Sequence, residues 1–293
     1  MPARRALRIG LVVLSLAGPS LTASRPASAQ DGASREDGAE AQYRVALALK
    51  REGRLDEALA AAAEVVRLRP DHAGPHFTIG SIHRQAGRLD AALVEFRRVV
   101  ELTPTAATGH AMVGAVLARL ERCEEAIPAL ERATELDAQD GASWANLGAC
   151  LRRARRVEEA IVVYQLGLAA RPGDPDLLNN LAVALRQAGR PEAAVEALEA
   201  ALARAPDDAD LHRNAAIALR GLTRWAEAAR HYEAWARLVP SPDDPSPLFD
   251  LAYCYEQLGR RDEARATYER YLARVRDPER RRAAEERRDA LGR

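Results

Sequence analysis

The chain has 293 residues, 43 basic and 43 acidic side chains, a hydrophobic content of 47% and three cysteines. This length and apolar content are sufficient for one or two domains with a real core, and they exclude a disordered chain or a small disulfide-stapled one. Aromatic residues make up only 4%, Ala and Leu dominate, and alternating runs of β-branched residues are scarce. The composition therefore predicts an all-α protein.

Residues 1–29 have the pattern of a secretory signal peptide. Arg4, Arg5 and Arg8 form a positive head, residues 9–17 are apolar, and Ala27, Ser28 and Ala29 form a small-residue cleavage site. The apolar run is shorter than the roughly twenty residues that span a bilayer. We expect an exported, periplasmic protein. An uncleaved inner-membrane anchor and an organellar transit peptide are the alternatives, and only the uncleaved anchor would make the membrane a partner.

Cleavage after Ala29 would remove four arginines and no acidic residue. The mature chain would then carry four more acidic than basic side chains. This balance argues against nucleic-acid binding.

Helix-terminating prolines recur at intervals of 34 residues, which is the sign of a repeat boundary. They are Pro70, Pro104, Pro172, Pro206 and Pro240, with Ala138 in the remaining place. The predicted units are 39–72, 73–106, 107–140, 141–174, 175–208, 209–244 and 245–276. Residues 30–38 are a predicted short linker, and the charged residues 277–293 are a predicted C-terminal capping helix.

Each unit reads as two helices joined by a turn. Position 8 of every unit, counted from its first residue, is Gly or Ala, and position 20 is always Ala, which predicts a close helix crossing. We expect the larger residues at positions 7, 11 and 24 to fill the space between adjacent hairpins. Asp140, Asp174, Asp208 and Asp244 are expected as N-caps. A glycine such as Gly87 or Gly189 marks the turn between the helices.

The segment "ASWANLGACLRRARRVEEAIVVYQLGLAARP", residues 142–172, carries a familiar motif with Trp144, Leu147, Gly148, Ala160 and Tyr164 in register. Over residues 39–276 the chain resembles the tetratricopeptide repeat family. The resemblance implies a right-handed superhelical solenoid of antiparallel hairpins, whose first helices line a concave groove. The chain departs from the motif at Ala138 and Gly167, and three residues replace the turn glycine: Glu121, Arg155 and Thr223.

Asparagine occupies position 6 in three consecutive units, as Asn146, Asn180 and Asn214. An amide both donates and accepts hydrogen bonds, so such a row is able to hold an extended peptide backbone. It resembles the asparagine ladder of the protein O-linked N-acetylglucosamine transferases. The alternative is that Asn is simply common at this position of the repeat.

A second row is basic. Its members at positions 12 and 13 are Lys50, Arg51, Arg84, Arg119, Arg152, Arg153, Arg186 and Arg220. Guanidinium groups on one concave face would attract carboxylates, so the row predicts an acidic protein or peptide partner. The alternative is an ordinary solvated face, because the chain has one lysine and uses arginine at every other basic position.

Phe77 and Tyr253 occupy groove positions near the two ends of the solenoid, together with Tyr43 and Phe249. We expect them either to grip apolar side chains of a ligand or to pack at the ends.

No arrangement of residues suggests catalysis, a metal or a cofactor. His76, His110 and His212 share position 4 with Trp144, and we expect packing rings there rather than metal ligands. Cys123 and Cys150 lie near each other in the predicted packing, which leaves open either a disulfide or small buried side chains.

The sequence therefore predicts a non-enzymatic interaction scaffold of the bacterial cell envelope, which binds a partner's extended segment or helix in its groove. The alternatives are a membrane-tethered assembly factor and an accessory subunit of a polysaccharide or pilus secretion apparatus.

Overall fold

The computed structural model describes the backbone of residues 27–292 and the side chains of residues 38–292. Every regular element in this part of the chain is an α-helix, which confirms the predicted fold class. The helices are α1 (Ala27–Arg51), α2 (Leu55–Leu68), α3 (Ala73–Gln85), α4 (Leu89–Leu102), α5 (Ala107–Arg119), α6 (Cys123–Leu136), α7 (Gly141–Arg153), α8 (Val157–Ala170), α9 (Pro175–Gln187), α10 (Pro191–Leu202), α11 (Ala209–Gly221), α12 (Trp225–Leu238), α13 (Ser246–Gln257), α14 (Arg261–Leu272) and α15 (Pro278–Ala290).

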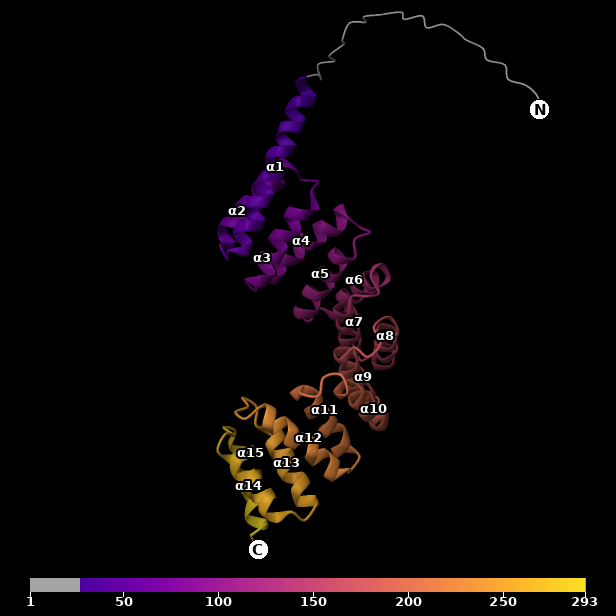
Figure 1. Cartoon of the computed structure of the whole chain (residues 1–293), viewed down its shortest axis with the longest axis vertical. Helices are drawn as coiled ribbons and strands as arrows, with labels where there is room; N and C mark the ends of the chain where they lie inside the picture. The colour runs from indigo at the N-terminus through magenta and orange to yellow at the C-terminus, as the bar shows by residue number, and fades with distance from the viewer. Residues whose placement is uncertain (1–26, 293) are drawn as a thin grey trace, which may run out of the picture.

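The helices pair into seven hairpins that stack along an arc (Figure 1). Each even-numbered helix packs on the odd-numbered helix before it and on the next one after it, and α15 packs on α14. One core of buried side chains runs through most of the stack, from Ala92 to Ala264. The predicted solenoid of antiparallel hairpins is therefore what the chain forms.

Helix α1 is longer than the first helix of the other hairpins. It begins at Ala27, so residues 30–38 belong to this helix, where the sequence predicted a linker. The predicted signal peptide lies outside the described residues except for residues 27–29.

The two helices of a hairpin cross closely at position 8. A Cβ atom on Gly80 would lie 2.9 Å from the ring of Phe96, and one on Gly148 would collide with the ring of Tyr164. Both bulky partners are at position 24 of the same unit and are fully buried. The predicted crossing is present, because only a small side chain leaves room there.

Two packing expectations need correction. Position 24 was expected between adjacent hairpins, yet Phe96 and Tyr164 lie over position 8 of their own hairpin. Val45, at position 7 of the first unit, is 47% exposed. The other residues at this position are packed by a preceding hairpin, and no described hairpin precedes α1.

Aspartates begin several of the inner helices. Asp174 accepts a hydrogen bond from the backbone N–H of Leu177 at 3.1 Å, and Asp208 accepts one from Leu211 at 3.0 Å. Asp140 caps α7 through Ala142. These three N-caps are confirmed, whereas the N-cap of α13 is Pro245 and Asp244 bonds Ser246 from one residue further out.

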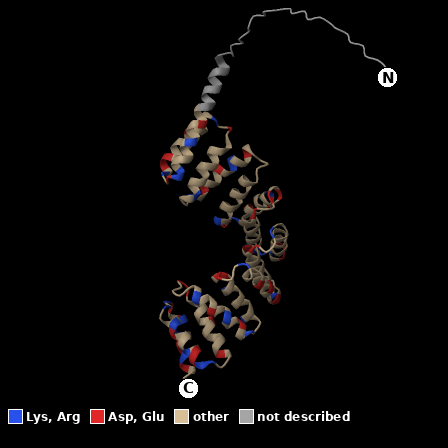
Figure 2. Cartoon of the chain, in the orientation of Figure 1, with Lys and Arg blue, Asp and Glu red and all other residues tan. Residues whose placement is uncertain are grey.

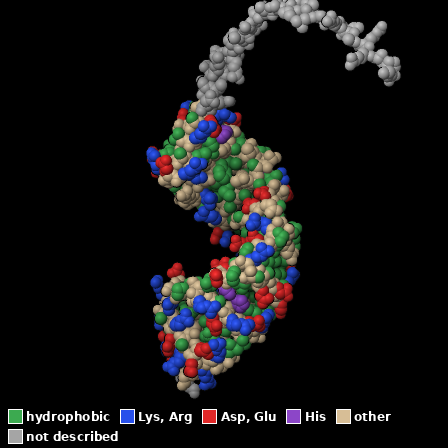
Figure 3. Space-filling model, in the orientation of Figure 1, with side chains coloured by type: hydrophobic (Ala, Val, Ile, Leu, Met, Phe, Trp, Pro, Cys, Tyr) green, Lys and Arg blue, Asp and Glu red, His purple; other side chains and the backbone are tan. Residues whose placement is uncertain are grey.

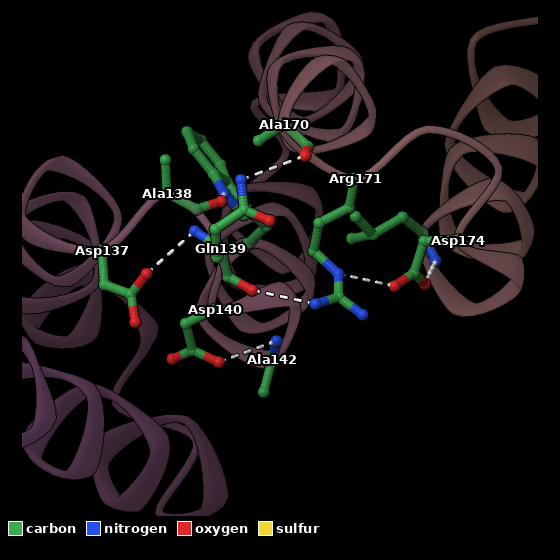
Figure 4. A network of polar contacts seen from close by, with 10 residues as sticks. Asp137, Ala138, Gln139, Asp140, Ala142, Ala170, Arg171 and Asp174 are labelled. Atoms are coloured by element: carbon green, nitrogen blue, oxygen red, sulfur yellow. Dashed lines mark hydrogen bonds and ion pairs between the residues drawn. The ribbon is translucent and has the colours of Figure 1, made fainter.

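The boundary without proline is held by polar contacts instead (Figure 4). Gln139 donates from its side chain to the carbonyl of Ala170 at 3.2 Å, and Arg171 donates to the carbonyl of Gln139 at 2.9 Å. Arg171 also pairs with Asp174 at 2.8 Å. These bonds tie the loop after α6 to the loop after α8, so the departure at Ala138 does not loosen the stack.

Every hairpin turn contains one residue in the left-handed conformation at position 15. Glycine occupies it in four units, and the non-glycine residues there are Glu121 (φ 60°), Arg155 (φ 64°) and Thr223 (φ 55°). The turn geometry is thus kept where the glycine is missing. Thr223 is the most strained of the three because it is β-branched.

Replacing Thr223 by Gly should therefore raise the free energy of unfolding by about 1 kcal/mol, because the left-handed conformation costs an L-residue roughly 1–2 kcal/mol and the flexibility of Gly offsets part of the gain. Urea-induced unfolding followed by circular dichroism measures the change. The reverse substitution at position 15 of another unit, Gly189→Thr, is the control and should lower the free energy of unfolding. A Thr223→Gly variant less stable than the wild type would contradict this account of the turn.

Candidate functional site

The odd-numbered helices form the inner side of the arc. Helices α5, α7 and α9 each contact the next odd-numbered helix as well as their hairpin partners, and α1 contacts α3. The space-filling view shows the hollow on this inner side, with charged side chains of both signs at its edges (Figure 3). A bound segment would therefore contact positions on the inner helices.

A pocket of about 640 Å³ opens among α1, α3 and α5. Its basic lining residues are Lys50, Arg84 and Arg119, and its apolar ones include Phe77 and Met112. Among the described residues, no acidic side chain lines it. The pocket thus joins three cations to an apolar surface.

A second pocket, of about 310 Å³, lies between α5 and α7. Arg119 lines it as well, together with Asn146 and Arg153, and its one acidic residue is Glu121. Because Arg119 belongs to both pockets, they form one continuous surface. We call this surface the basic groove, with Lys50, Arg84, Arg119 and Arg153 as its cations.

These cations have little internal compensation. Within the part of the chain that the structure describes, Lys50, Arg84 and Arg119 have no ion-pair partner, and Arg153 donates only to the carbonyl of Ala118, at 3.3 Å. Partial burial and the neighbouring charge of Arg84 lower the pKa of Lys50. Such crowding of like charges favours the binding of an anionic group.

The C-terminal part of the predicted basic row behaves differently. Arg220 pairs with Asp250 of the next unit at 2.9 Å, and the Tyr232 hydroxyl donates to the same carboxylate at 3.1 Å. Burial raises the pKa of Asp250, against the opposing effect of Arg220. Arg220 is therefore a structural partner of Asp250 and is not free for a ligand.

The last inner helix is covered by the chain itself. Tyr253 packs edge-on against Trp225 at 5.6 Å between ring centroids and lies under the guanidinium of Arg287 at 4.8 Å. Arg287, from the capping helix, also bonds Glu256 at 3.0 Å. Tyr253 is thus held by packing at the end, whereas Phe77 lines the basic groove.

The structure places the other predicted residues on the inner helices but not together. Asn214 donates to Asn179 at 2.8 Å, a partner that the sequence analysis did not anticipate. Arg186 is exposed and Arg152 is half-buried. Burial raises the pKa of Tyr164 to about 12, against the opposing charge of Arg152. Of the amide row, only Asn146 lines the basic groove.

A hollow of about 860 Å³ lies outside the groove, between α15 and the loop before α13. Three of its four arginines are already bonded within the fold, and one of these, Arg280, donates to the Ser246 hydroxyl at 3.4 Å. Arg281 donates to the carbonyls of Leu272 and Val275, and Arg274 donates to that of Arg270. This hollow therefore marks the attachment of the capping helix.

The cysteines are free and buried. Cys123 and Cys150 belong to the same core cluster, and burial followed by contact with Cys123 raises the pKa of the Cys150 thiol to about 12. Among the two possibilities that the sequence left open, the structure has small buried thiols.

Two family models, both described as tetratricopeptide repeat, match almost the whole solenoid. One matches residues 21–73, 43–107 and 114–175, and the other matches residues 151–219 and 219–287. The chain belongs to the tetratricopeptide repeat family. Repeats of this family are protein-interaction modules, so the chain has the fold of a protein-interaction scaffold.

Solved tetratricopeptide repeat structures have the same fold. YrrB, described as a tetratricopeptide repeat protein with an unusual peptide-binding site, is 25% identical, with 58% of this chain and 88% of YrrB covered at a TM-score of 0.52. PilF of Pseudomonas aeruginosa is 18% identical, with 73% of this chain and 97% of PilF covered at a TM-score of 0.62. A tetratricopeptide repeat protein of Parabacteroides merdae is 13% identical, with 88% of this chain and 100% of that protein covered at a TM-score of 0.63. No curated protein matches the chain.

Replacing Asp250 by Ala should lower the free energy of unfolding by about 1–3 kcal/mol, because it leaves the buried Tyr232 hydroxyl without an acceptor and Arg220 without its counter-charge. Asp243→Ala, at an exposed position seven residues earlier in the loop before α13, should change the free energy of unfolding by no more than about 0.5 kcal/mol. Thermal and urea unfolding of the two variants checks the difference. Equal stability of the two would show that the pair at Arg220 is only a surface contact.

Proposed function

We propose that this protein is a non-enzymatic interaction scaffold of the bacterial cell envelope, which binds an extended segment or helix of an acidic partner protein in the basic groove. The observation that carries the proposal is the set of uncompensated cations at Lys50, Arg84 and Arg119 around one pocket. Elsewhere charges of both signs alternate along the solenoid (Figure 2), and most cations have a carboxylate nearby.

The lining of the groove favours a particular kind of segment. Phe77 and Met112 offer an apolar surface beside the guanidinium groups, and Asn146 offers an amide to a peptide backbone. A segment that alternates carboxylate and apolar side chains would satisfy both. The peptide-binding site named for YrrB supports a peptide ligand for this fold.

Fluorescence anisotropy with a labelled synthetic peptide of alternating Glu and Leu tests the proposal. The double variant Arg84→Glu, Arg119→Glu should bind at least about tenfold more weakly, since two attractive contacts become repulsive. The double variant Arg237→Glu, Arg282→Glu changes the net charge equally at exposed positions on α12 and α15, outside the groove, and should bind like the wild type. A peptide with Gln in place of Glu should bind weakly to the wild type and to both double variants.

Equal affinity of the two double variants would show that the basic groove is a solvated face and would overturn the proposal. Arg220 is left out of the design, because a glutamate there would face Asp250 and disturb the fold.

We also propose that the chain is exported and that residues 1–29 are removed. The basic head, the apolar stretch and the small residues at 27–29 support this proposal. Among the described residues, none of the helices is both long enough and apolar enough to span a bilayer. Cleavage after Ala29 would shorten α1 by three residues and leave both helices of the first hairpin in place.

Intact-mass spectrometry of the protein isolated from the envelope fraction tests this. The expected mass is that of residues 30–293. A chain that keeps its N-terminal segment would instead support the membrane-tethered assembly factor, and a chain recovered only from the cytosol would overturn export.

A further inference from the structure

Two histidines of the sixth unit face each other. His212 on α11 and His231 on α12 have their Nδ1 atoms 3.0 Å apart and their ring centroids 5.2 Å apart. Both are half-buried, and Figure 3 shows histidine side chains at the surface of the C-terminal half. The pair is therefore within reach of a dissolved ion.

The second ring nitrogen of His212 fixes its tautomer. Nε2 of His212 lies 2.9 Å from the carbonyl oxygen of Pro206, which only accepts hydrogen bonds. Nε2 thus carries the proton, and Nδ1 presents its lone pair to His231. A carbonyl that holds the other ring nitrogen in this way is the usual support of a metal-binding histidine.

We propose that the Nδ1 atoms of His212 and His231 together bind one divalent transition-metal ion of the nickel and copper class. Two nitrogens 3.0 Å apart, each about 2.1 Å from a metal, subtend about 90° at it. That angle fits neighbouring positions of a tetragonal centre with nitrogen and oxygen ligands. Water would fill the remaining positions.

Binding requires a change of tautomer in one ring only. In the structure His231 donates its Nδ1 proton to His212. With the metal in place that proton moves to Nε2 of His231. Both rings remain neutral and no proton is lost. Both rings must turn about their terminal torsions, which are soft, to aim their lone pairs at the ion.

Comparison of the units shows that the fold does not require this pair. Trp144 at the same position as His212 donates from Nε1 to the carbonyl of Ala138 at 2.9 Å, and His110 contacts that of Pro104 at 3.0 Å. In these three units position 4 bonds the preceding loop, whereas His76 of the second unit bonds Glu95, which is at the position of His231. The position of His231 is Ala61, Ala129 and Ala197 in three other units. His231 is an addition to the repeat.

The surroundings of His231 favour its neutral form. Burial, and then the proximity of His212 and Arg230, lower the pKa of His231, while Glu227 opposes them. The Glu227 carboxylate is itself held by Arg224 at 2.7 Å, and the two histidines have no other described carboxylate against them. Neutral imidazole is the form that binds a metal.

Isothermal titration of the untagged chain with NiCl₂ at about pH 7.5 tests the proposal, with MgCl₂ as a hard-ion control. We expect one saturable nickel site per chain, which His231→Ala abolishes and His110→Ala leaves unchanged. The affinity should fall at about pH 5.5 because protonated imidazole does not bind. Circular dichroism establishes that each variant is folded.

The repeat provides a gain-of-function test. His110 has the same carbonyl contact as His212 but faces Ala129, so Ala129→His should add a second nickel site. Absence of saturable nickel binding to the wild type, or binding that persists in His231→Ala, would overturn the proposal.

Discussion

The close crossing of the two helices in each hairpin is the constraint on which the rest of this structure depends. Gly or Ala at position 8 lies against a bulky side chain at position 24, as Gly80 does against Phe96 and Gly148 against Tyr164. This contact draws the outer helix onto the inner one and leaves the opposite side of the inner helix uncovered. Because every unit repeats it, the uncovered sides line up along the arc (Figure 1). The groove is therefore a consequence of packing within each hairpin.

Equivalent positions in successive units do not by themselves make a binding site. The two halves of the concave side differ in whether their basic side chains are paired with acidic ones. In the C-terminal half, Asp250 and Glu256 neutralise Arg220 and Arg287, and buried tyrosines complete the hydrogen bonds. In the N-terminal half, the cations around Phe77 have no such partners among the residues that the structure describes. An anionic ligand therefore has most to gain at the N-terminal half, where its carboxylates would not compete with internal ones.

Position 4 also differs between units, because different aromatic rings make the same hydrogen bond to the preceding loop. Trp144, His110 and His212 all contact the carbonyl at the end of the preceding unit. Once this bond sets the tautomer of a histidine, a second histidine at position 23 is enough to bring two nitrogen atoms together. New chemistry on a repeat scaffold thus needs only one substitution beside a position that is already held.

The sequence alone determined the helices of the repeats, most of their boundaries and the turn chemistry, because these depend on residues close together in the chain. It did not determine the start of α1, which includes the predicted linker. The 34-residue spacing, the caps at Asp140, Asp174 and Asp208 and the left-handed position of the turns were all readable, and the structure keeps that conformation even at Glu121 and Thr223. Only the tertiary structure decided which members of the basic and amide rows are free. Arg220 meets Asp250, Asn214 meets Asn179, and His212 meets His231, from positions 30, 35 and 19 residues away in the chain. Periodicity in the sequence predicts the same role for every member of such a row. The contacts of each side chain, however, depend on residues of another helix, and these residues differ from unit to unit.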